Sequence, residues 1–146
     1  MMDTFGLVMV VHTIFAAAWT GGALLISGTI IPAARNGLIE KNGLSLITRR
    51  FWYLTVGSVV LLLLTGGHLA GTLYTAESLQ STERGHLVLS MVALWFVLPL
   101  VLYLGSRHLT DIPPELSAET AAAAARPWFI GASAISIALL VIAGLL

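Results

Sequence analysis

Three histidines lie within or beside long apolar segments of this chain, and they are its best candidates for chemistry. His12 lies in "VVHTIF", His68 in "TGGHLAG" and His86 in "RGHLVL". Imidazole binds haem iron, copper and zinc. An ionisable side chain inside a membrane is energetically costly, so it normally faces the protein interior and has a partner or a function. The three histidines are therefore candidate ligands of a metal or a metal-containing cofactor.

Four apolar stretches must position these side chains. Hydrophobic residues make up 58% of the 146-residue chain and charged residues only 10%, which is too little charge for the surface of a soluble domain. No Asp, Glu, Lys or Arg occurs in residues 4–34, 51–76, 85–106 or 127–146. Each stretch reaches the roughly 20 residues that span a bilayer as a helix. We predict an all-α integral membrane protein, a single domain folded as a four-helix bundle with up-down-up-down topology.

The boundaries of the four helices follow from charges, prolines and caps. We predict helices over about residues 4–32, 51–74, 83–106 and 127–146. Pro32 and the following "AARNG" are expected to end the first helix. Pro127 suits the first turn of the fourth helix. Before it, "SAET" predicts a separate short surface helix capped by Ser117.

The loops differ in positive charge, and this difference predicts the orientation in the membrane. Every Lys and Arg except Arg84 lies in or at the ends of loops 33–50 and 107–126. The positive-inside rule places these two loops in the cytoplasm and both termini outside. The zero net charge offers no basic field for nucleic acid, so the expected partner is the lipid bilayer. The chain has no Cys, which excludes disulfides and thiolate metal sites.

In this topology the three histidines lie at similar depths. His12 follows Thr4 by eight residues, which places it about 12 Å into the first helix. His68 precedes Glu77 by nine residues and lies about 13 Å from the same face of the membrane. His86 begins the third helix at that face. Three helices are therefore predicted to bring one imidazole each to the outer leaflet.

Residues around the histidines suggest haem b as the ligand. Haem needs a flat slot, axial imidazoles and a cation for its propionates. Gly22 and Gly67 leave room for a planar group near the histidines. Trp19 lies seven residues from His12 on the same helix face and is a candidate wall, while Arg84 suits a propionate. We expect a b-type haem site that serves electron transfer, which would need a redox partner, or haem handling.

Two other interpretations stay open, as does the choice of ligand pair. Copper binding or transport would use the same histidines. In a purely structural membrane subunit, which has no cofactor and could form a homo-oligomer, the histidines would only hydrogen-bond neighbouring helices and the glycines would permit close packing. Neighbouring axes lie about 8–10 Å apart, so a haem between two imidazoles favours the diagonal pair His12 and His86. Depth instead favours His12 with His68.

The runs "HTIFAAAWTGGALL", "RRFWYLTVGSVVLLLLTGGHLAG" and "RGHLVLSMVALW" resemble the four-helix membrane domain of the CopD superfamily. This superfamily includes copper-resistance D domains and the HemJ-type protoporphyrinogen oxidases. The resemblance implies that His12 is the family's first-helix histidine, and HemJ-type members bind haem b. Members usually have a lysine in the third helix, where this chain has Ser90 and Met91. The missing lysine counts against oxidase catalysis and favours a haem or metal holder, so enzymatic activity stays open.

Overall fold

The computed structural model describes all 146 residues and contains helices but no strands. In chain order the elements are α1 (Thr4–Leu25), the π-helix η1 (Ile26–Ile30), α2 (Ile31–Arg35), α3 (Lys41–Leu73), α4 (Ala76–Ser81), α5 (Glu83–Ser106) and α6 (Ala118–Leu145). Four helical segments are long and apolar enough to cross a membrane: Thr4–Arg35, Lys41–Leu73, Glu83–Ser106 and Ala118–Leu145. The predicted all-α four-helix bundle is confirmed, and it fits a multi-pass membrane protein.

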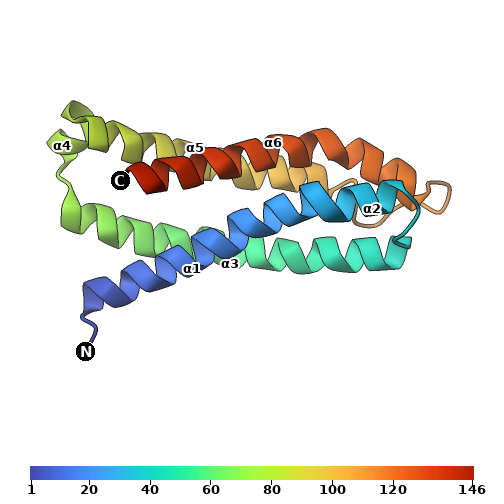
Figure 1. Ribbon diagram of the computed structural model, residues 1–146, viewed down its shortest axis with the longest axis horizontal. Coiled ribbons are helices and arrows are strands. Elements are labelled where there is room, and N and C mark those ends of the chain that lie inside the picture. The colour runs from blue at the N-terminus through green and yellow to red at the C-terminus, as the bar shows by residue number, and fades with distance from the viewer.

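The four long segments run alternately up and down, as predicted. Segment α1 packs against α3 and α6, and α5 packs against the same two helices, so α1 and α5 lie diagonally opposite. Both chain ends and α4 lie at one end of the bundle, here called the terminal end (Figure 1). The connections 36–40 and 107–117 lie at the other end. It is here called the basic end, because every Lys and Arg except Arg84 lies in that half of the bundle.

The inward face of α3 follows a seven-residue repeat. Its buried residues alternate at spacings of four and three: Leu44, Thr48, Phe51, Thr55, Ser58, Leu62, Thr65 and Leu69. This spacing is typical of helices that pack with a small left-handed crossing angle. The hydroxyls of Thr48, Thr55 and Thr65 each donate to a carbonyl of their own helix. The three buried threonines of α3 are therefore compatible with burial, whereas the buried hydroxyl of Ser58 has no partner.

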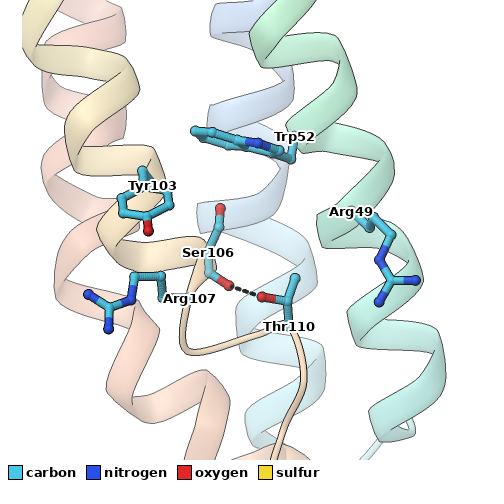
Figure 2. Close-up of a pocket in the computed structure, with 6 residues that line it drawn as sticks. All are labelled: Arg49, Trp52, Tyr103, Ser106, Arg107 and Thr110. Atoms are coloured by element: carbon cyan, nitrogen blue, oxygen red, sulfur yellow. Dashed lines mark hydrogen bonds between the residues drawn. The ribbon is translucent and has the colours of Figure 1, made fainter.

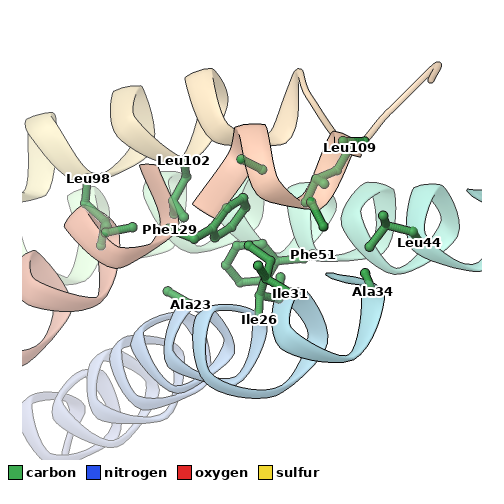
Figure 3. Close-up of a cluster of buried hydrophobic side chains, with 14 of the residues drawn as sticks. Ala23, Ile26, Ile31, Ala34, Leu44, Phe51, Leu98, Leu102, Leu109 and Phe129 are labelled. Atoms are coloured by element: carbon green, nitrogen blue, oxygen red, sulfur yellow. The ribbon is translucent and has the colours of Figure 1, made fainter. Parts of the chain in front are cut away.

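The tightly packed core lies toward the basic end. Figure 3 shows apolar side chains from the first segment, α3, α5 and α6 converging there, among them Ile31, Phe51 and Phe129. No residue of α1 before Trp19 is buried, and none of α6 after Ser136. The half of the bundle nearest the terminal end is thus more loosely packed, and it is the half that contains His12.

The second long helix begins earlier than predicted. Segment α3 starts at Lys41 rather than at residue 51, so the non-helical part of the first loop shrinks to residues 36–40. The additional turns are amphipathic: Leu44 is buried whereas Arg49 and Arg50 are exposed. The uncharged stretch 51–76 marks only the part of α3 that suits lipid, because charged residues occur where the helix continues beyond it. The predicted start was therefore wrong, while its end at Leu73 agrees with the sequence.

Pro32 does not end the first helix, which continues to Arg35. The N–H of Ile31 donates to the carbonyl of Ile26, five residues back, in the π-helical turn. Pro32 then falls in the first turn of a new helical segment, where its missing N–H is not required. The helix therefore ends within "AARNG", as predicted, but the predicted bound at Pro32 was wrong, because the π turn shifts the hydrogen-bond register before the proline.

The fourth helix also begins earlier than predicted, at Ala118, with Pro127 in its interior. Ser117 is its N-cap, as predicted, and accepts a hydrogen bond from the N–H of Thr120. The predicted separate surface helix is instead the first part of α6. Ala118, Ala121, Ala122 and Ala125 are buried in the core, so packing holds the helix together across the proline. The predicted bounds of the third helix, 83–106, agree with α5.

Candidate cofactor site around His12

The ring of His12 is joined to α3 by a hydrogen bond whose direction can be assigned. Nδ1 of His12 lies 2.8 Å from the hydroxyl oxygen of Thr65. That hydroxyl donates its single hydrogen to the carbonyl of Leu61 at 2.6 Å. It must therefore accept from His12, so the neutral imidazole has its proton on Nδ1 and a lone pair on Nε2.

Gly66 makes room for this ring. A Cβ at Gly66 would lie 3.2 Å from Cε1 of His12, closer than ordinary contact. The half-buried imidazole therefore lies over a part of α3 that has no side chain. A ring whose one nitrogen donates to a fixed acceptor is held in orientation, which is how metal-binding imidazoles are usually supported. Nε2 of His12 is therefore left with a free lone pair, which is what a ligand of iron or copper needs.

The other two predicted ligands lie elsewhere on their helices. The side chains of His68 and His86 are both exposed. Nε2 of His86 donates to the carbonyl of Gln80 at 2.7 Å, which ties the start of α5 to α4. No group of three or more His, Cys, Asp or Glu side chains is arranged to hold a metal ion. The structure thus joins His12 to Thr65 and Gly66, and does not gather the three histidines into one cluster.

Trp19 and Gly22 both pack α1 against α3. Trp19 is 1% exposed, and its indole N–H donates to the hydroxyl of Thr55 at 3.2 Å. A Cβ at Gly22 would lie 2.7 Å from the ring of Phe51, so this glycine permits close approach of the two helices. Such contacts between helices are expected if the two residues serve helix packing rather than a cofactor.

The remaining predicted site residues face outward. A Cβ at Gly67 would meet nothing within 4 Å. Arg84 is exposed and forms no ion pair. Neither residue forms a hydrogen bond with His12, whose ring is bonded to Thr65 and lies next to Gly66.

The sequence analysis did not identify Thr65, although the sequence contains a pattern that points to this residue. Thr65 occupies an inward position of the seven-residue repeat in α3, and it immediately precedes the glycine pair of "LTGGH". A hydroxyl on the inward face of one transmembrane helix is a natural acceptor for an intramembrane histidine of a neighbouring helix. The repeat could therefore have identified Thr65 as the partner of His12, given that α1 and α3 are neighbours.

Comparisons of this chain with protein families, with curated proteins and with solved structures found no match.

Proposed function

We propose that this membrane protein binds a b-type haem through Nε2 of His12. The observation that carries the proposal is the chain of hydrogen bonds from His12 to Thr65 to the carbonyl of Leu61. It supports Nε2 as a lone-pair donor of defined direction, and imidazole nitrogen is the usual proximal ligand of haem iron. The resemblance to haem-binding members of the CopD superfamily supports the same assignment.

The residues fit a haem held by one imidazole rather than by two. His68 and His86 are exposed, and the ring of His86 is bonded to α4. In this proposal Thr65 keeps the proton of His12 on Nδ1, and Gly66 leaves space for the ring. The haem itself supplies an iron that accepts and donates one electron, which suits electron transfer, or it is a cargo that the protein hands on.

We further propose that the basic end faces the cytoplasm. Every Lys and Arg except Arg84 lies in or beside the segments 33–50 and 107–126 at the basic end, whereas the terminal end has only Arg84, in the first turn of α5. Cytoplasmic loops are enriched in these residues. Both termini and His12 then belong to the external side, and a soluble redox partner or haem acceptor would approach from there.

Haem reconstitution of the purified full-length protein in detergent tests the proposal. We expect a stoichiometric Soret band with the high-spin spectrum of a single imidazole. His12→Ala should lose the haem. Thr65→Val retains the imidazole but removes its acceptor, and we expect about 10–100-fold weaker haem binding, as for other supporting groups of metal ligands.

His108→Ala is the matched control, because His108 lies at the basic end and should leave the spectrum unchanged. An unaltered Soret band in His12→Ala would overturn the assignment of the ligand. A low-spin spectrum of two imidazoles, lost equally in His12→Ala and His86→Ala, would replace the one-histidine site by the diagonal pair.

A second candidate is a structural membrane subunit, which the same hydrogen bond favours. A side-chain hydrogen bond between transmembrane helices contributes about 0.6 kcal/mol on average. The His12–Thr65 bond therefore helps to stabilise the pairing of α1 and α3 even if no cofactor is bound. Protein that takes up no haem, and whose stability falls similarly in His12→Ala and Thr65→Val, would select this function. Metal analysis of the same preparation tests the copper alternative.

A further inference from the structure

A hollow of about 120 Å³ lies between α3 and α5 at the basic end, away from His12. Figure 2 shows the residues that line it: Arg49, Trp52, Tyr103, Ser106, Arg107 and Thr110. Two are arginines, Arg49 of α3 and Arg107 immediately after α5, two are aromatic and two carry hydroxyls. No function described so far uses any of them.

The charge at this hollow is positive and weakly compensated. Arg107 forms no ion pair, and its guanidinium carbon lies 5.9 Å from the ring centre of Tyr103. Arg49 lies 3.8 Å from Asp111, whose side chain is 92% exposed. A long contact with a solvated carboxylate contributes little. Both guanidinium groups therefore retain most of their capacity to bind an anion.

A buried hydroxyl supplies a second, independent sign of a ligand. Ser106 is 6% exposed, and its Oγ has no hydrogen-bond partner. Figure 2 shows this oxygen on the side of the residue that faces Trp52, while the carbonyl of Ser106 accepts from the hydroxyl of Thr110. This hydroxyl is one of five buried side-chain polar atoms without a partner, and it is the one of the five that lines this hollow. Its hydrogen is therefore free for an acceptor that enters the hollow from outside the chain.

The hollow lies at the depth of lipid headgroups. Arg49 and Arg50 immediately precede the uncharged stretch 51–76, and Arg107 immediately follows the stretch 85–106. The rings of Trp52 and Tyr103 have centroids 5.7 Å apart, in the aromatic belt that marks a membrane–water interface. The group most abundant at this depth that accepts hydrogen bonds from arginine and serine is the phosphate of a phospholipid.

We infer that this hollow binds the phosphodiester group of an anionic phospholipid. Figure 2 shows the side chains of Arg49, from α3, and Arg107, the residue after α5, on opposite sides of the hollow. In this inference both long side chains turn inward to bind the phosphate, and the hydroxyl of Ser106 donates to one of its oxygens. Basic pockets between transmembrane helices bind anionic headgroups in this way, and guanidinium–phosphate hydrogen bonds are among the stronger ones. The site is at the opposite end of the bundle from His12, so lipid binding there does not depend on haem binding.

Native mass spectrometry of the full-length protein from nanodiscs tests the inference. The discs contain equal amounts of phosphatidylglycerol and phosphatidylcholine. We expect the wild-type protein to retain phosphatidylglycerol selectively. Arg49→Gln and Arg107→Gln should each lower that retention about ten-fold, and Arg107→Lys should lower it less, because lysine keeps the charge but not the fork of donors. Ser106→Ala should weaken retention of both lipids by a few-fold, since it removes one hydrogen bond to the phosphate.

Arg50→Gln is the matched control, because Arg50 is the neighbouring exposed arginine on α3 and does not line the hollow. Unchanged retention in this variant supports the site. Equal loss in Arg50→Gln and Arg49→Gln would overturn it in favour of general surface charge, as would a wild-type protein without lipid preference. Inorganic phosphate that binds the detergent-solubilised protein as tightly as the lipid would overturn the lipid assignment in favour of a soluble anion. Circular dichroism of each variant establishes that the helices are retained.

Discussion

The indole N–H of Trp19 donates to the hydroxyl of Thr55, and that hydroxyl in turn donates to the carbonyl of Phe51. The ring of His12 makes the same connection to Thr65, which donates to Leu61. Two aromatic nitrogens of α1 are therefore bonded to two threonines of α3 that have already used their own hydrogens. This repetition defines how the two helices pair, and it makes each ring nitrogen the donor.

The Trp19–Thr55 bond should contribute measurably to stability. Trp19→Phe removes the donor and leaves Thr55 bonded to its own helix, so we expect a loss of about 0.6–1.7 kcal/mol beyond the change in packing. Thr55→Val leaves the indole N–H buried without an acceptor, so we expect a larger loss of about 1–3 kcal/mol. Unfolding by dodecyl sulfate in mixed micelles measures both. Additive effects in the double variant would show that the bond contributes nothing.

Two adjacent glycines should respond differently to the same substitution. Gly66→Ala places a Cβ 3.2 Å from the ring of His12 and should displace it from Thr65, whereas Gly67→Ala meets nothing within 4 Å. We expect Gly66→Ala to weaken haem binding several-fold and to change the NMR signal of the His12 Nδ1–H. Gly67→Ala should alter neither. The same haem affinity in both variants would contradict the position assigned to the imidazole.

Gly22 should matter for stability through the approach of α1 to α3. Gly22→Leu directs a side chain at the ring of Phe51, and overpacking of this kind costs about 1–3 kcal/mol. Gly21→Leu is the control, because a Cβ at Gly21 meets nothing within 4 Å. Micellar unfolding compares the two variants. Partial recovery on adding Phe51→Ala to Gly22→Leu would identify the clash, and equal stability of both leucine variants would refute it.

Single introduced cysteines test the orientation cleanly, because the chain contains none of its own. Ala76 and Leu38 are exposed at opposite ends of the bundle. In intact cells we expect Ala76→Cys to react with an impermeant thiol reagent and Leu38→Cys to react only after the membrane is permeabilised. The reverse pattern would place the basic end outside and His12 on the cytoplasmic side.

The number of helices long and apolar enough to span a membrane was determined by the sequence alone. Four uncharged stretches of sufficient length have no other low-energy state in a bilayer, because every buried backbone group must be bonded within its own helix. Local signals of the same kind also predicted the bounds of α5 and the cap at Ser117. Such features depend on residues close together in the chain, so no knowledge of packing was needed.

The partner of each side chain was decided only by the tertiary structure. The position of a residue along the bundle axis follows from the helical rise of about 1.5 Å per residue. His12, His68 and His86 were therefore correctly expected toward one end of the bundle. Direction depends on how each helix is rotated about its axis, and one residue changes that direction by roughly 100°. Packing of α1 against α3 turned His12 toward Thr65 and left His68 exposed.

Packing likewise decided the ends of the helices in the charged segments. Residues 41–50 and 118–126 are helical because Leu44 and the buried alanines of α6 complete the core at the basic end, beyond the stretches that suit lipid. Hydrophobicity along the chain cannot reveal this, since a helix that extends into water is stabilised by its tertiary neighbours rather than by its own composition.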